Sequence, residues 1–120
     1  AGADVLTGTA QLTVGPIEVA EDAGLPWFGN QSNQAILAPS QVVASQVYHL
    51  EVAIREILAE VDANATSGGT FPLTLGNGGT LLEFNPNYPL DPALRRRADD
   101  LLLGVAAGSI VVEVDVSVEE

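Results

Sequence analysis

The sequence has no cysteine, no methionine and no lysine, and aromatic residues make up only 5% of it. The absence of cysteine excludes disulfides, thiol chemistry and cysteine-based zinc sites. Continuous apolar runs are far shorter than the ~20 residues that a membrane-spanning helix requires, so we expect none. Because small residues open a chain without methionine, we expect that the initiator was removed or that the chain begins after processing.

Positive charge is scarce as well. The 4 arginines stand against 16 acidic residues, which gives a formal net charge of −12. Such a chain repels phosphate backbones and anionic lipid headgroups, so we expect neither a nucleic-acid partner nor a membrane partner. The lack of lysine fits a GC-rich genome that encodes arginine in its place, and it fits a surface adapted to high salt equally well.

Length and hydrophobicity predict a single folded domain, 1–120. A hydrophobic content of 47% separates this chain from acidic disordered tails, which combine high net charge with low hydrophobicity. A chain of 120 residues can bury one modest core. Residues 1–20 alternate threonine with small apolar residues and are predicted to form an extended arm or edge strand, which Gly15-Pro16 kinks or ends.

A long helix is predicted over 40–63, because apolar residues recur there every three or four positions. These residues are Val43, Val47, Leu50, Ile54, Ile57 and Val61. Ser40 is expected to cap the helix, and Asn64 with the Gly68-Gly69 pair is expected to end it. The regular spacing indicates a helix with one apolar side.

The remaining segments predict an α+β fold, with both helices packed on a small, mainly antiparallel sheet. Residues 92–103 are predicted to form a short helix, with Asp91 as its cap and Pro92 at its first position. Residues 70–84 are predicted to form a hairpin that turns at 76–79. N-terminal and C-terminal strands complete the predicted sheet, the latter over 110–118, where β-branched residues alternate with polar ones.

No set of residues predicts catalysis, a cofactor or a metal. His49 is the single histidine, and no nucleophile or orienting carboxylate lies at helical spacing from it. The stretch 62–68 begins like a calcium loop but lacks the glycine and the glutamate of that pattern. Glu113 and Asp115 share a strand face and are interpreted as solvated acids. We therefore expect a protein that is not an enzyme.

The candidate functional residues are instead those of a protein interface. Adjacent aromatic residues concentrate binding energy, and Trp27-Phe28 is interpreted either as core or as an anchor in a neighbouring subunit. The helical seam supplies further candidates in Val43, Val47, Leu50 and Ile54. Arg95 and Arg96 have acidic residues at helical spacing, whereas Arg97 is predicted to dock on the acidic surface of a neighbour.

The chain resembles the small structural proteins of tailed-phage particles, such as capsid decoration proteins and head or tail accessory subunits. The resemblance lies in the opening Ala-Gly-Ala-Asp-Val-Leu-Thr-Gly, the Pro/Gly-rich middle and the Val-rich closing strand. It implies a non-enzymatic virion subunit that binds a larger protein shell or tube, often as a trimer, with the N-terminal arm reaching over its neighbours. The predicted long helix departs from a typical decoration subunit.

An alternative from another class is a ligand- or sugar-binding module of a secreted or cell-surface protein. In that case Trp27, Phe28 and Tyr88 would line the site. A self-associating chain favours the structural subunit, whereas a monomer that binds a small molecule favours the binding module.

Overall fold

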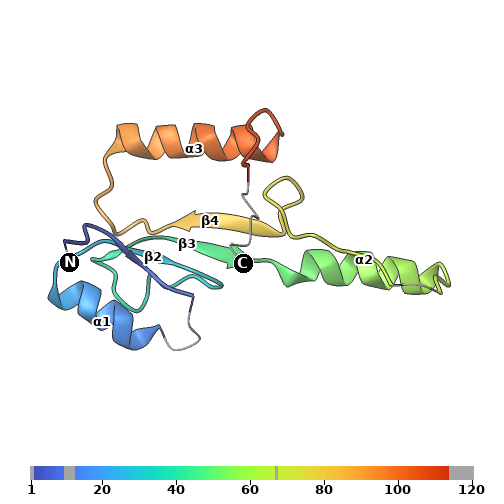
Figure 1. Ribbon diagram of the computed structural model, residues 1–120, viewed down its shortest axis with the longest axis horizontal. Coiled ribbons are helices and arrows are strands. Elements are labelled where there is room, and N and C mark those ends of the chain that lie inside the picture. The colour runs from blue at the N-terminus through green and yellow to red at the C-terminus, as the bar shows by residue number, and fades with distance from the viewer. Residues whose placement is uncertain (1, 10–12, 67, 114–120) are drawn as a thin grey trace, which may run out of the picture.

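A computed structural model describes residues 2–9, 13–66 and 68–113 of the chain. Three α-helices and a four-stranded sheet make up the fold, so the predicted α+β class is confirmed (Figure 1). In chain order the elements are β1 (Leu6–Thr7), α1 (Val14–Asp22), β2 (Trp27–Gly29), β3 (Val42–Tyr48), α2 (Leu50–Asp62), β4 (Thr80–Phe84) and α3 (Pro92–Ala106).

The sheet is mixed, with strand order β1-β2-β3-β4. Both the β1–β2 pair and the β2–β3 pair are parallel, and only the β3–β4 pair is antiparallel. The prediction of a mainly antiparallel sheet was therefore wrong. The three parallel strands carry their carboxyl ends to the same edge of the sheet.

The core lies between α1 and the centre of the sheet. Ile17 and Ala20 of α1 pack with Trp27, Ala38 and Val42, and Leu6 and Ala35 pack around this cluster. In β3 the four consecutive residues from Val42 to Ser45 are all buried. Burial of consecutive residues on both faces is typical of a central strand, and β3 lies between the parallel strand β2 and the antiparallel strand β4.

The first half of the predicted long helix is a strand in the structure, and only its second half is helical. Residues 42–48 form β3, and α2 begins only at Leu50, so neither Ser40 nor any residue before His49 caps it. Val43 and Val47 are four positions apart, a spacing that places side chains on one face of a helix and equally on one face of a strand. The end of the helix was predicted correctly, since α2 stops at Asp62 and Asn64 adopts a positive φ of 57°.

The N-terminal arm is also different from the prediction. Only Leu6–Thr7 forms a strand, and α1 begins at Val14, where a strand end was expected. Pro16 lies in the first turn of α1. A proline is tolerated there because the first amides of a helix have no partner within the helix.

The predicted hairpin over 70–84 is present only in its second half. Its turn forms, with Gly78 at a φ of 73°, but 70–79 is not a strand and β4 pairs with β3 instead. The predicted C-terminal strand is absent from 110–113, and 114–118 lies outside the described residues.

Helix α3 confirms the second predicted helix. The Asp91 carboxylate accepts hydrogen bonds from the amides of Ala93 and Leu94, and Pro92 occupies the first helical position. The helix continues to Ala106, beyond the predicted stop at Gly104. Local capping chemistry was sufficient to predict where it begins.

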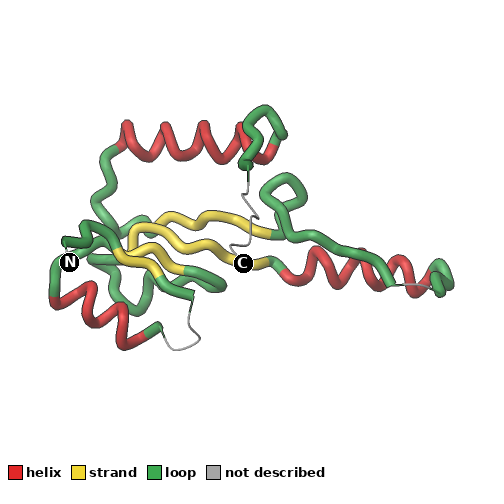
Figure 2. Tube along the Cα trace, in the orientation of Figure 1, coloured by secondary structure: helices red, strands yellow, loops and turns green. Residues whose placement is uncertain are grey.

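The molecule is extended. Its radius of gyration is 17.5 Å, against about 14 Å for a compact domain of this length. Figure 1 shows the reason, because α2 projects beyond the end of β3 and α3 lies on the β4 side, away from α1. The tube view in Figure 2 shows the same separation of α2 and α3 from the strands. No helix in the described ranges is both long enough and apolar enough to cross a bilayer.

Candidate functional site

The carboxyl ends of the three parallel strands form the candidate site. Ligands of sheets with parallel strands bind outside these ends, where the loops that follow the strands converge. Here the converging segments are Thr7–Thr9 at the end of β1, Asn30–Asn33 after β2, and Tyr48 with His49 at the end of β3. We call this set the carboxyl edge.

Gln31 joins the three segments of the carboxyl edge. Its backbone carbonyl accepts a hydrogen bond of 3.3 Å from the Tyr48 amide, and its side-chain amide donates one of 3.4 Å to the carbonyl of Thr9. Its φ is 72°, a left-handed conformation that is uncommon outside glycine and asparagine. Backbone strain of this kind is concentrated at functional sites.

A buried polar network holds the Asn30–Asn33 loop against the sheet. The Trp27 indole donates to Gln34 Oε1 at 2.7 Å, and Gln34 Nε2 donates to the carbonyl of Asn30 at 3.0 Å. The backbone N–H of Gln34 donates to Ser45 Oγ, also at 3.0 Å. Gly29 leaves room for this network, since a Cβ there would lie 2.5 Å from Ser45 Oγ. The carboxyl edge is thus built on a rigid support.

Two buried polar atoms at the carboxyl edge, Asn30 Oδ1 and His49 Nε2, have no hydrogen-bond partner within the described part of the chain. His49 precedes α2, and its Nδ1 lies 2.9 Å from Glu51 Oε1. With Nδ1 donating to Glu51, Nε2 remains a free acceptor. A hydrogen bond from its own backbone N–H and one from the His49 ring lower the pKa of Glu51 below its ordinary value.

The partnership of His49 and Glu51 differs from the sequence analysis, which placed the histidine in mid-helix and excluded this carboxylate. His49 is the residue just before the helix, where the backbone has φ −101° and ψ 76°. Side chains two positions apart can meet at such a boundary, although they cannot within a helix.

The carboxyl edge contains no arginine, aspartate or glutamate of its own. Two carboxylates contact it: Glu51 Oε1 lies 2.9 Å from His49 Nδ1, and Glu83 Oε2 accepts from Asn33 Nδ2 at 2.7 Å. Amides and hydroxyls in this arrangement offer both donors and acceptors. The edge can therefore pair with an uncharged polar molecule, whereas the neighbouring carboxylates disfavour an anion.

The structure separates the residues that the sequence analysis grouped as an interface. Trp27 is 1% exposed and belongs to the core, so the core interpretation of this residue applies. Val43 is buried in β3, and Phe28 and Val47 are half-buried in the sheet. Leu50 and Ile54 do lie exposed on α2.

The arginine cluster lies on α3. Arg95 pairs with Asp99 at 3.0 Å, as predicted, and its guanidinium stacks 3.9 Å above the ring of Phe84. Among the described residues Arg96 and Arg97 form no ion pair, and Asp91 caps the helix instead of pairing with Arg95. The cluster is distant in sequence from the carboxyl edge and supplies no residue to it.

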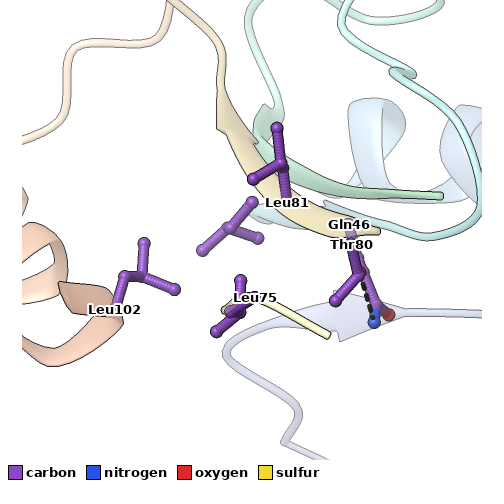
Figure 3. A pocket seen from close by; sticks show the side chains of 6 residues that line it. Gln46, Leu75, Thr80, Leu81 and Leu102 are labelled. Atoms are coloured by element: carbon purple, nitrogen blue, oxygen red, sulfur yellow. Dashed lines mark hydrogen bonds between the residues drawn. The ribbon is translucent and has the colours of Figure 1, made fainter. Parts of the chain in front are cut away.

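Two hollows lie away from the carboxyl edge. One, of about 260 Å³, includes Tyr88 with Phe84 and Arg95, and neither Trp27 nor Phe28 lines it. The other, of about 320 Å³, is lined by leucines of β4, of α3 and of the turn that precedes β4 (Figure 3). Its polar members, Gln46 and Thr80, hydrogen-bond to each other. Figure 3 shows Leu102 of α3 reaching toward Leu75 across this hollow.

The described residues contain no group of histidine and acidic side chains that could hold a metal ion. The carboxyl edge was not predicted from the sequence, although one feature of the sequence indicates it. The uncharged run Asn30-Gln31-Ser32-Asn33 directly follows the short apolar segment that forms β2. Recognising it required knowledge that β1, β2 and β3 are parallel neighbours.

No protein-family model and no curated protein matches the sequence. Solved structures do share its fold. A transcriptional activator of the comK gene from Bacillus halodurans has a TM-score of 0.74 and 19% identity, over 92% of this chain and 39% of the other. An ABC transporter solute-binding protein from Conexibacter woesei has a TM-score of 0.58 and 22% identity, over 93% of this chain and 38% of the other.

These similarities define the chain as an α+β domain with a fold found in larger proteins. It spans less than half the length of either solved structure. The identities, below 25%, concern the fold alone.

Proposed function

We propose that the chain is part of a solute-binding protein and that its carboxyl edge contacts a small, uncharged polar solute. The observation that carries this proposal is the convergence of uncharged polar segments at the ends of three parallel strands, with Gln31 in a left-handed conformation at their centre. The similarity to a solute-binding protein of an ABC transporter supports it. A secreted or cell-surface location follows from this function.

The chemistry of the carboxyl edge narrows the class of solute. Side-chain amides at Gln31 and Asn33 can donate to and accept from hydroxyl or amide groups. Tyr48 is 40% exposed at the end of β3 and offers a ring face to a flat or cyclic molecule. Sugars, sugar alcohols and nucleosides fit these contacts, whereas phosphorylated or carboxylated analogues would meet Glu51 and Glu83.

A thermal-shift screen tests the proposal. A ligand that binds only the folded chain stabilises it by about 2.7 kcal/mol at a concentration of one hundred times its Kd. We expect uncharged hydroxyl-rich compounds to raise the melting temperature and their phosphate esters to have a smaller effect. If no uncharged polar compound shifts the transition, solute binding is excluded for this chain.

The substitution Gln31→Gly connects binding to the carboxyl edge. Glycine adopts the positive φ of this position without strain, so the change removes the amide and leaves the backbone in place. Loss of one hydrogen bond of about 1.5 kcal/mol should weaken binding of the solute found in the screen about tenfold by calorimetry.

The matched control is Asn64→Gly, at the other non-glycine residue with positive φ among the described residues. It lies beyond the far end of α2 and should leave the Kd unchanged. Equal effects of the two substitutions would place the binding site elsewhere.

A second candidate function is the structural subunit of a homomeric assembly, as in a virion, which the exposed apolar side of α2 favours. This function predicts that the chain sediments as a trimer or larger species. A single species of 12.4 kDa in sedimentation velocity, at all concentrations tested, would contradict it.

A further inference from the structure

Helix α2 exposes an entire apolar face. We call Leu50, Ile54, Ile57, Leu58 and Val61 the α2 stripe. Their spacing places them within an arc of about 100° on one side of the helix. Each is between 42% and 64% exposed, and no residue of α2 is buried. An amphipathic helix is stabilised by covering such a face, and no segment in residues 2–9, 13–66 or 68–113 buries the α2 stripe.

The segment that follows α2 covers a different side of the helix. A Cβ at Gly69 would lie 3.3 Å from the Glu60 carboxylate and 3.2 Å from the ring of Phe71. Glu60 lies off the α2 stripe, about 120° from Ile54 around the helix. The chain therefore returns along the polar side of α2 and leaves the α2 stripe open.

Helix α3 has a bare face too. Leu94 and Leu101 are seven positions apart, which places them on the same side of the helix, and they are 57% and 50% exposed. Leu102, on another side, faces the hollow toward Leu75 (Figure 3). We call Leu94 and Leu101 the α3 face. Two helices that both leave the sheet thus present apolar side chains that no described residue covers, and contiguous exposed apolar surfaces mark interaction sites.

A second copy of this chain is a poor occupant for these surfaces. Each copy carries a net charge of −12. Glu51 and Glu60 flank the α2 stripe along the helix, so stacking one stripe on another brings like charges together.

More of the same polypeptide is the better occupant. Two solved structures share the fold over 92% and 93% of this chain, yet the shared part is only 39% and 38% of theirs. Both of these proteins therefore carry a large amount of further chain. The radius of gyration of 17.5 Å also indicates a part that completes its packing against another body.

We infer that the α2 stripe and the α3 face form the docking surface for a second domain of the same polypeptide, outside residues 1–120. The inference goes beyond solute binding and does not depend on it. The docked domain covers α2 and α3, and the carboxyl edge stays a separate surface next to the start of α2.

Cysteine labelling tests the inference, because residues 1–120 contain no cysteine and labelling of an introduced thiol can be followed by mass spectrometry of its own peptide. Ile54→Cys places a thiol in the α2 stripe, and Glu56→Cys places one on an exposed position of the same helix outside it. Both are introduced into the polypeptide encoded by the complete gene. We expect the thiol of Ile54→Cys to react with a maleimide at least tenfold more slowly than that of Glu56→Cys, at every protein concentration.

Equal reaction rates of the two thiols would overturn the inference. Protection of Ile54→Cys that disappears on dilution would overturn it in favour of a second copy. A gene that encodes nothing beyond these residues would overturn it as well. Leu101→Cys, with Arg96→Cys as its control on α3, repeats the measurement for the α3 face. If the thiol of Leu101→Cys is protected at every protein concentration, the result supports a single docked domain that covers both helices.

Discussion

Trp27→Ala is expected to lower the free energy of unfolding by about 3–5 kcal/mol. Trp27 is 1% exposed and is among the largest fully buried side chains, in contact with the α1 residues Ile17 and Ala20 through the core cluster. Its removal leaves a cavity at the contact between α1 and the sheet, and Gln34 Oε1 loses its indole donor. Urea unfolding followed by circular dichroism measures the loss.

Trp27→Phe separates the two contributions to that loss. Phenylalanine keeps most of the buried ring but cannot donate to Gln34, so this variant should lose about 1–3 kcal/mol for the unpaired buried oxygen. Domains of this size are typically stable by only 5–15 kcal/mol, so Trp27→Ala removes a large share. A loss below about 1 kcal/mol for Trp27→Ala would contradict the placement of Trp27 in the core.

Gly29→Ala should have the second largest effect. The added Cβ would lie 2.5 Å from Ser45 Oγ and 2.9 Å from Gln34 Oε1, both of which are engaged in the buried network. Crowding of this kind costs about 1–3 kcal/mol, and displacement of the Gln34 hydrogen bonds adds to it. We expect a lower melting temperature together with a disturbed Asn30–Asn33 loop.

The control for Gly29→Ala is Gly15→Ala in α1. A Cβ at Gly15 meets no atom within 4 Å, and alanine favours the helix by up to about 1 kcal/mol. The double variant Gly29→Ala/Ser45→Ala removes the crowded hydroxyl and should recover part of the stability. A Gly29→Ala protein as stable as the parent would show that the network tolerates a side chain there.

Stability and function are connected through this network. Gln34 bonds simultaneously to the core through Trp27, to β3 through Ser45, and to the first residue of the loop through Asn30. A buried network with its members paired holds a surface loop in one conformation. The loop in question supplies the central segment of the carboxyl edge, so the core positions the surface that we propose to bind solute.

Some short-range features were predicted correctly from the sequence, although Ser40 as a helix cap and Gly104 as a helix stop were not. Asp91 and Pro92 predicted the beginning of α3, and Asn64 predicted the end of α2. The turn at 76–79 was also predicted, and Asn77 stabilises it through hydrogen bonds to the amides of Thr74 and Gly79. Each of these features depends on residues within a few positions of one another, which a sequence contains in full.

Pairing over long range was not predictable in the same way. Val43 and Val47 satisfy both the helical and the strand period, and only the neighbours β2 and β4 select the strand. Likewise, residues 30–33 after β2 have the sequence of an ordinary polar loop. Only the parallel pairing of the strands places Gln31 beside Thr9 and Tyr48 at one edge of the sheet.

Composition and local pattern therefore determined by themselves the acidic character, the α+β class and the helix boundaries at Asp91 and Asn64, because these follow from side-chain charge and from contacts close in the chain. Tertiary structure alone decided that Trp27 is core, that residues 42–48 extend through the centre of the sheet, and that the α2 stripe stays uncovered. The physical reason is that burial and strand pairing depend on which distant segments meet, and apolar residues spaced four apart are compatible with more than one such arrangement.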